Sequence, residues 1–237
     1  MPKNLFQHVP GIAIAVAFAT CLFAGPLAAQ ETVTTFDAGE EGWNGNASLE
    51  TEGGHPGANM RFLLETFGIE LRNDSNAAFI GDMTGSGTVT VGLDAKADSI
   101  TFLGNEVSRN VVVEFRSHAL GQDGYPWSSV WVVLGTIQAD PEWHAYSVSF
   151  DPASTEMPAG WGGYGAEDPV TFEPMLPDGV TFADVMANVD ELAFTTFEPG
   201  MFYGFTIFDA RMDNLRIIRG TGSDVIFADG FDPPPVR

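Results

Sequence analysis

Apolar and polar side chains alternate in a series of short segments along this chain. In residues 88–93 the apolar positions are Val89, Val91 and Leu93, and residues 111–116 alternate in the same way. Period-2 patterning places successive side chains on opposite faces of a strand. Similar apolar or alternating segments follow at 130–134, 146–150, 192–195 and 215–217. Gly, Pro, Asp and Asn bound these segments, so the pattern predicts an all-β fold, an antiparallel β-sandwich.

For two of the predicted strands, the sequence also predicts which residues share a face or how far the strand is buried. In residues 111–116, Val111, Val113 and Phe115 share one face, and Val112, Glu114 and Arg116 share the other. Residues 130–134 are apolar at every position, which predicts a strand buried on both faces.

One segment has a helical pattern instead. Thr181 and Asp184 have the spacing of a capping box, and the apolar residues between 182 and 189 recur at helical intervals. The sequence therefore predicts one short helix of two to three turns, which plugs an end of the sandwich or covers one of its faces.

The first thirty residues have the layout of a secretory signal peptide. Lys3 precedes the apolar run of residues 12–24, Gly25 and Pro26 break that run, and small residues end at Ala29. The run is shorter than the about 20 residues that a membrane span needs. We therefore predict a signal peptide over 1–29, one sandwich domain over 30–219 and a C-terminal tail over 220–237. The mature protein is expected to be secreted or periplasmic, with no membrane attachment.

Charge and cysteine content narrow the possible partners. The formal net charge is −22, and the only cysteine is Cys21 in the apolar leader. The mature chain thus has no disulfide and no thiolate nucleophile. Such an acidic chain repels phosphate backbones and anionic lipid surfaces, so nucleic acid is a poor candidate partner and we expect none.

Three segments together resemble a known family. They are residues 36–43 (FDAGEEGW) with 53–57 (GGHPG), residues 79–83 (FIGDM), and the helix region followed by 212–217 (MDNLRI). Their order resembles the laminin-B-type and galactose-binding-like jelly rolls of exported bacterial proteins. The resemblance implies a jelly-roll sandwich whose first and last strands are neighbours. Residues 224–231 (DVIFADGF) also resemble a short C-terminal ending, IF.DGFE, found on exported proteins.

The same resemblance implies a structural calcium ion between the first and last strands. Asp37 and Asp213 would then supply carboxylate oxygens, which are the donors that Ca²⁺ prefers. The alternative is that Asp37 caps a turn and Asp213 accepts hydrogen bonds from backbone amides.

Four aromatic residues in glycine-rich segments are the candidate ligand-binding residues. Tyr125 and Trp127 flank Pro126, and Trp161 and Tyr164 lie in the sequence AGWGGYG. Flat rings left accessible by neighbouring glycines stack on the apolar faces of sugars. The alternative is that these rings fold back over the ends of the sandwich.

Recognised catalytic motifs are absent from the sequence. His55, His118 and His144 have no metal-binding spacing, and neither a nucleophile elbow nor a phosphate-binding loop occurs. We therefore expect a secreted, non-catalytic binding module for carbohydrate or another extracellular glycan. The alternatives are a carbohydrate-active hydrolase or lyase with paired carboxylates, for which Glu40–Glu41 and Glu167–Asp168 are candidates, and a structural or surface interaction protein. The sequence leaves the ligand's identity and the oligomeric state open.

Overall fold

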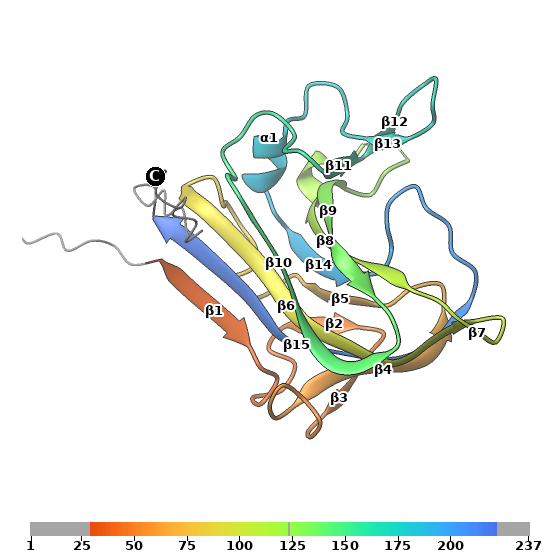
Figure 1. Cartoon of the computed structure of the whole chain (residues 1–237). Coiled ribbons are helices and arrows are strands. Elements are labelled where there is room, and N and C mark those ends of the chain that lie inside the picture. The colour runs from red at the N-terminus through yellow and green to blue at the C-terminus, as the bar shows by residue number, and fades with distance from the viewer. Residues whose placement is uncertain (1–28, 123, 222–237) are drawn as a thin grey trace, which may run out of the picture.

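The computed structural model describes residues 29–122 and 124–221 of the chain, and its main feature is two antiparallel sheets packed face to face (Figure 1). The seven-stranded sheet has the order β10-β6-β15-β4-β3, with β1 beside β15 and β7 beside β6. Its strands are β1 (Gln30–Thr34), β3 (Ser48–Glu50), β4 (Asn59–Thr66), β6 (Ser86–Phe102), β7 (Asn105–Glu106), β10 (Asp140–Phe150) and β15 (Thr206–Thr221).

The six-stranded sheet has the order β11-β9-β8-β14-β5-β2. Its strands are β2 (Trp43–Gly45), β5 (Glu70–Asn73), β8 (Arg109–Ser117), β9 (Ser128–Ile137), β11 (Trp161–Tyr164) and β14 (Glu191–Thr195). A small hairpin of β12 (Ala166–Glu167) and β13 (Pro174–Met175) and a 3₁₀ turn, η1 (His118–Leu120), lie outside the two sheets. The prediction of an antiparallel β-sandwich jelly roll with one short helix is confirmed.

The first and last described strands are neighbours. β1 pairs antiparallel with the C-terminal half of β15, from Gln30 opposite Arg219 to Thr34 opposite Leu215 (Figure 1). This is the arrangement that the family resemblance implied, and it adds β1 to the seven-stranded sheet beside β15.

Alternation along the strands builds the core between the sheets. Val89, Val91 and Leu93 of β6 and Val111 and Val113 of β8 are fully buried. Burying one such side chain stabilises the fold by about 1.5–3 kcal/mol relative to leaving it exposed. The six-stranded sheet is thereby fixed rigidly against its partner, which leaves its other face available for polar side chains.

One expectation about burial was wrong. Residues 130–134 of β9 are buried on one face only, because Val130 and Val132 face the core whereas Trp131 and Val133 are half-buried on the opposite face. These two apolar side chains on the outer face of β9 are therefore only partly shielded from solvent.

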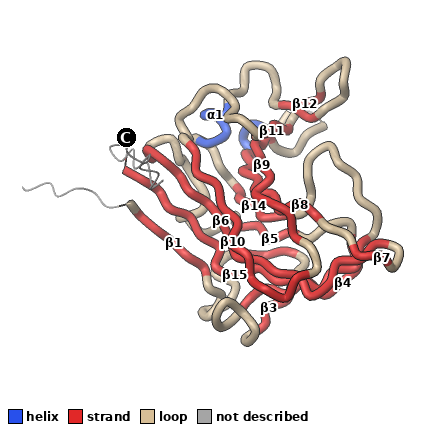
Figure 2. Tube along the Cα trace, viewed as in Figure 1, coloured by secondary structure: helices blue, strands red, loops and turns tan. Residues whose placement is uncertain are grey.

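The predicted helix is present, but with 5 residues it is shorter than the predicted two to three turns. α1 (Phe182–Met186) begins after Thr181, whose hydroxyl accepts a hydrogen bond from the Asp184 backbone while the Asp184 carboxylate accepts one from the Thr181 backbone. Phe182, Val185 and Met186 are buried, so the helix covers one end of the sandwich, as Figure 2 shows.

The ends of the chain lie mostly outside the described residues. The predicted signal peptide (1–29) and the predicted tail (220–237) lie mostly in residues 1–28 and 222–237, outside the described residues. β15 continues to Thr221, so its last two residues fall within the predicted tail. No helix within the described residues is long and apolar enough to cross a membrane.

Candidate functional site

A cavity of about 460 Å³ lies on the outer face of the six-stranded sheet. Five charged side chains of β5, β8 and β14 form its floor: Glu70, Arg72, Glu114, Arg116 and Glu191. Trp127 and Tyr164 line one side, and the segment 197–201 that follows β14 lines the other. We call this cavity the groove.

Strand register brings the floor residues together. Arg116 on β8 lies directly opposite Glu191 on β14, and Glu114 lies opposite Ala193. Ala193 in turn lies opposite Arg72 on β5. Because directly opposed residues of antiparallel strands share a face, the same alternation that buries the valines of β8 turns its two charged residues outward.

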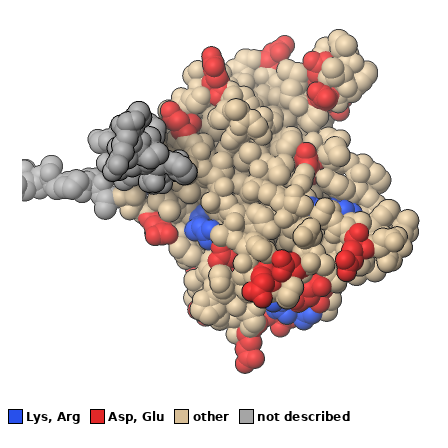
Figure 3. Space-filling view, in the orientation of Figure 1, with Lys and Arg blue, Asp and Glu red and all other residues tan. Residues whose placement is uncertain are grey.

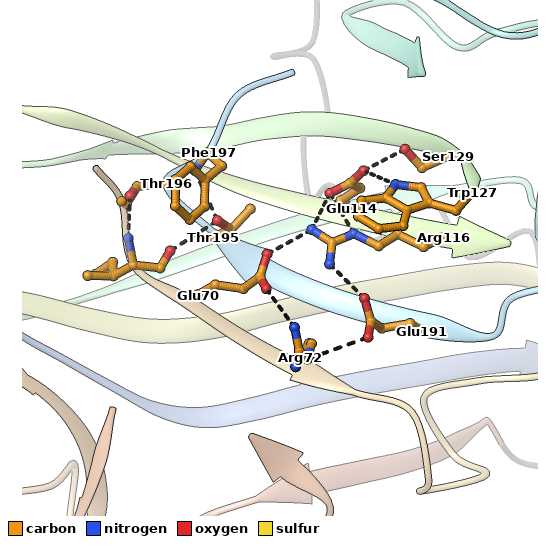
Figure 4. Close-up of polar contacts among 12 residues, drawn as sticks. Glu70, Arg72, Glu114, Arg116, Trp127, Ser129, Glu191, Thr195, Thr196 and Phe197 are labelled. Carbon is orange, nitrogen blue, oxygen red and sulfur yellow. Dashed lines mark hydrogen bonds and ion pairs between the residues drawn. The ribbon is translucent and has the colours of Figure 1, made fainter. Parts of the chain in front are cut away.

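Arg116 is the centre of the floor, and three carboxylates surround it (Figure 4). Its Nε donates to Glu114 Oε2 at 2.8 Å, its Nη1 to Glu191 Oε1 at 2.6 Å and its Nη2 to Glu70 Oε2 at 2.7 Å. Burial of the guanidinium works to lower the pKa of Arg116, but the charges of Glu114 and Glu70 outweigh it and raise that pKa. Arg116 is therefore a fixed cation that orients three acidic side chains.

Both oxygens of Glu114 are occupied by protein donors. Oε2 accepts two bonds from Arg116, and Oε1 accepts from Ser129 Oγ at 2.5 Å and from Trp127 Nε1 at 3.3 Å. Glu114 is thus held in place as an anchor for Trp127, with both of its oxygens already accepting from protein donors.

Glu70 and Glu191 each keep one less engaged oxygen. Glu70 Oε1 lies 3.6 Å from Arg72 Nη1, and Glu191 Oε2 lies 3.6 Å from Arg72 Nε. These separations exceed the usual range of N–H···O hydrogen bonds. Two carboxylate oxygens on the groove floor can therefore accept hydrogen bonds from hydroxyl groups of a ligand.

Three of the four predicted ligand-binding residues lie together at the groove. The Trp127 ring stacks over the Arg116 guanidinium at 4.7 Å and is 6.0 Å from the Tyr164 ring. Tyr125 meets Tyr164 edge-on at 5.3 Å, and Trp127 and Tyr164 line the cavity. The structure thus places an aromatic wall beside the acidic floor.

Trp161 lies on the opposite face of the sheet. It is paired with Val132, which faces the core. Its ring is 6.0 Å from Phe115, 4.9 Å from Phe150 and 5.1 Å from Phe182. These contacts give Trp161 a packing role under α1, the alternative considered above.

Parity along the strand explains the difference between Trp161 and Tyr164. Both belong to β11 (Trp161–Tyr164), where residues three apart point to opposite faces. The flanking glycines indicated accessibility for both rings. Strand parity, which applies only because these residues form β11, separates them.

The charged floor was missed at the sequence level. The available signal was Glu114 and Arg116 at alternate positions of a strand that is otherwise apolar. Their partners Glu70, Arg72 and Glu191 come from strands that are distant in sequence. The predicted pairs Glu40–Glu41 and Glu167–Asp168 do not line the groove.

Asp37 and Asp213, the predicted calcium ligands, both contact the turn formed by residues 55–58. Ala58 N donates to Asp37 Oδ1 at 3.0 Å, and His55 N donates to Asp213 Oδ2 at 2.5 Å. Asn214 N donates to the other oxygen of Asp213 at 2.6 Å. As arranged, these carboxylates accept backbone amides. Among the described residues, no group of three acidic, histidine or cysteine side chains is placed to hold a metal ion.

Asp213 is nonetheless an unusual carboxylate. Its side chain is fully buried, and burial, followed by the nearby charges of Asp94 and Asp37, raises its pKa to about 6 even though two amides donate to it. The described part of the chain therefore contains one acid whose ionisation changes in mildly acidic solution.

Comparison with known proteins gives structural likenesses only. No family model matches the sequence, and no curated protein matches it. Among solved structures, a family 11 carbohydrate-binding module from Clostridium thermocellum in complex with a β-1,3-1,4-mixed-linked tetrasaccharide has a TM-score of 0.44 at 13% identity. The match covers 84% of this chain and 92% of that one.

Two larger proteins are also similar. The carbohydrate-binding and catalytic modules of a Clostridium thermocellum endo-1,4-β-D-xylanase, complexed with xylohexaose, match with a TM-score of 0.44 at 14% identity over 79% of this chain. An exo-β-agarase matches with a TM-score of 0.45 at 12% identity over 81% of this chain. The chain spans 28% of the xylanase structure and 26% of the agarase.

Proposed function

We propose that this protein is an exported, non-catalytic carbohydrate-binding module that holds a neutral glycan in the groove. The observation that carries the proposal is the arrangement of Trp127 and Tyr164 beside the less engaged oxygens of Glu70 and Glu191. Sugars present an apolar C–H face and a rim of hydroxyls, and a site with an aromatic wall and acceptor floor matches both.

Preorganisation of the wall supports a binding role. Trp127 is fixed by the guanidinium of Arg116 beneath it and by the hydrogen bond to Glu114. A ring that is already immobile loses little conformational entropy when a ligand stacks on it, so more of the contact energy appears as affinity.

The same contacts argue against glycoside hydrolysis in the groove. A hydrolase needs one carboxyl group that donates a proton and a second that acts as nucleophile or base. Glu114 accepts four hydrogen bonds from protein groups, and Glu70 and Glu191 each give an oxygen to Arg116. These carboxylates are arranged as fixed acceptors.

Charge supports a neutral ligand over an acidic one. The chain carries a formal net charge of −22, and the three acidic side chains on the floor outnumber its two arginines. Arg116 already donates to three carboxylates, so polyuronates or sulfated glycans would be repelled by the acidic floor.

Retention on polysaccharide gels tests the proposal. The exported protein is run through gels containing xylan, mixed-linkage β-glucan or agarose, with polygalacturonate as the acidic comparison. We expect retention by at least one neutral polysaccharide, and loss of that retention in Trp127→Ala with little change in Tm. Trp143→Ala is the control, because Trp143 stacks on His55 at 5.6 Å, away from the groove lining. Failure of every neutral polysaccharide to retain the protein contradicts the proposal.

Calcium binding at Asp37 and Asp213 stays a prediction. The two carboxylates lie at one turn and Asp213 is buried with like charges near it, so a cation would relieve their repulsion. Differential scanning calorimetry at pH 7 with calcium and with chelator is the measurement. We expect a higher Tm with calcium, and an identical Tm under both conditions contradicts the site. The signal peptide, the laminin-B-type relationship and the tail are likewise proposals, supported by the sequence alone.

A further inference from the structure

We infer that Trp131 is a second stacking platform for the same glycan, so that the ligand is a chain long enough to touch Trp127 and Trp131 together. The inference rests on the proposed function and deepens it. Trp131 belongs to the apolar run of β9, where the sequence predicted burial on both faces, and it is half-buried on the outer face of the sheet.

Strand pairing places Trp131 beside the charged floor. On β8 its directly opposed residue is Glu114, whose side chain also receives the Trp127 indole N–H. Opposed residues on one face have Cβ atoms about 4.5–5.5 Å apart. The two indoles therefore lie on the same face of the sheet, with Glu114 in contact with one ring and opposite the other.

Gly162 is what allows the Trp131 ring to lie across β11. It is paired with Trp131, and a Cβ added to Gly162 would lie 2.4 Å from Cζ2, 2.5 Å from Cε2 and 2.8 Å from Nε1 of the indole. The indole N–H points toward the Gly163 carbonyl oxygen at 3.4 Å. The ring thus rests on bare backbone in one orientation, and any side chain at position 162 would displace it.

The spacing of the two rings sets the size of the ligand. Trp127, Ser129 and Trp131 are alternate residues that run into and along β9 (Ser128–Ile137). Four residues of strand at about 3.3 Å each separate the two Cα atoms by about 13 Å. A single sugar ring cannot stack on both indoles, so the site selects a linear oligosaccharide segment that follows β9.

A purely structural role for Trp131 makes the opposite experimental prediction. If the ring only covers β11, its removal lowers stability and leaves affinity unchanged at every ligand length. If it is a platform, its removal weakens long ligands selectively, because a short ligand that occupies the Trp127 end does not reach it.

The experiment is a ligand-length series measured by isothermal titration calorimetry on the exported protein. The probes are the disaccharide to hexasaccharide fragments of whichever neutral polysaccharide retains the protein. The variants are Trp131→Ala and Gly162→Ala, with Trp143→Ala as the matched control on the other sheet and Tm recorded for each. We expect Trp131→Ala to weaken the hexasaccharide by roughly tenfold, about 1.4 kcal/mol, and to leave the disaccharide unchanged. Gly162→Ala should act in the same direction because it displaces the ring.

Each outcome has a distinct meaning. If Trp131→Ala binds the hexasaccharide as tightly as the unmodified protein does, Trp131 is not a second platform. The same conclusion follows if the variant loses equal affinity for ligands of every length. Either result leaves the proposed function intact. If no neutral polysaccharide retains the protein, both the second platform and the proposed function are wrong. Acrylamide quenching in the Trp127→Phe background gives an independent readout. In that variant, bound hexasaccharide should protect more of the indole fluorescence from acrylamide when residue 131 is Trp than when Trp131 is replaced by Phe.

Discussion

Two buried charges differ in how the fold treats them. Arg116 is almost entirely enclosed and has a carboxylate on each side. Asp213 is equally enclosed but receives only backbone amides, with Asp94 and Asp37 as nearby like charges. A buried ion that is surrounded by opposite charges orients those partners. A buried acid without such partners has a pKa that is raised toward neutral pH.

Replacing Arg116 should therefore damage both stability and binding. In Arg116→Met three acidic side chains lose their shared cation, and breaking such a buried network costs about 3–5 kcal/mol. Urea denaturation of the two proteins measures this loss in the free energy of unfolding. Arg72→Met is the control, because the Arg72 side chain is 46% exposed and its ion pairs are 3.6 Å long, so the expected loss is below about 1 kcal/mol. Equal losses in the two variants would contradict the central role of Arg116.

Asp213 should make stability depend on pH in a direction opposite to that of most acids. Its folded pKa of about 6 lies above the ordinary value of 3.8, so ionised Asp213 destabilises the fold at pH 7. The difference corresponds to about 3 kcal/mol at pH 7, and it disappears as pH falls from about 6 toward 4. The free energy of unfolding of Asp213→Asn relative to the unmodified protein should therefore fall over this window as the pH is lowered. The comparison cancels acids such as Asp209, whose lowered pKa acts at lower pH. A flat difference between pH 7 and pH 4.5 contradicts the assignment.

At the scale of elements, alternation along each strand was readable from the sequence, but the pairing of strands was not. The faces of β6 and β8, the capping box at Thr181 and the neighbouring first and last strands were predicted, since each depends on local pattern or a recognisable order of motifs. The floor of the groove depends on which strand lies beside β8. Glu191 meets Arg116 across 75 residues, a register that a single sequence does not specify.

The two predictions that the structure overturned also failed because a single sequence does not specify the tertiary surroundings of a segment. Residues 130–134 satisfy the pattern of a doubly buried strand, but Trp131 and Val133 on the outer face of β9 are only partly buried. Trp161 was grouped with Tyr164 because glycines surround both, and strand parity separates them. At 130–134 the strand was predicted and its burial was not, whereas at 161–164 the strand itself was not predicted.

The short helix gives a test at the element scale. Thr181→Ala removes the hydroxyl that accepts the Asp184 N–H at 3.2 Å and donates to the Asp184 carboxylate at 2.6 Å. Loss of an N-cap costs about 1 kcal/mol, and here the helix also holds Phe182 against Trp161 and Phe150. Chemical denaturation should show this loss, while Thr155→Ala in an exposed loop should show none. Glycan affinity should not change, because α1 does not line the groove.

At the scale of the whole molecule, the acidic surface and the groove are separable features. Figure 3 shows acidic side chains spread over the visible face with few basic ones among them, in keeping with the net charge of −22. The groove floor, by contrast, neutralises most of its own charge through Arg116 and Arg72. Long-range repulsion should thus act on approaching polyanions, and short-range stacking and hydrogen bonding should hold the bound glycan.

Ionic strength distinguishes these two contributions. The Debye length falls from about 30 Å at 0.01 M salt to about 3 Å at 1 M, so the field of the acidic surface is removed by salt whereas stacking on Trp127 is not. We expect the affinity for a neutral polysaccharide to change by less than about twofold over this range, because a neutral ligand neutralises no charge when it binds. Polygalacturonate should not be retained at 0.01 M salt, and any weak retention should appear only at high salt, where the repulsion is screened. Retention of polygalacturonate that is strongest at low salt would mean that Arg72 or another cation recognises acidic sugars, and the neutral-ligand proposal would then be wrong.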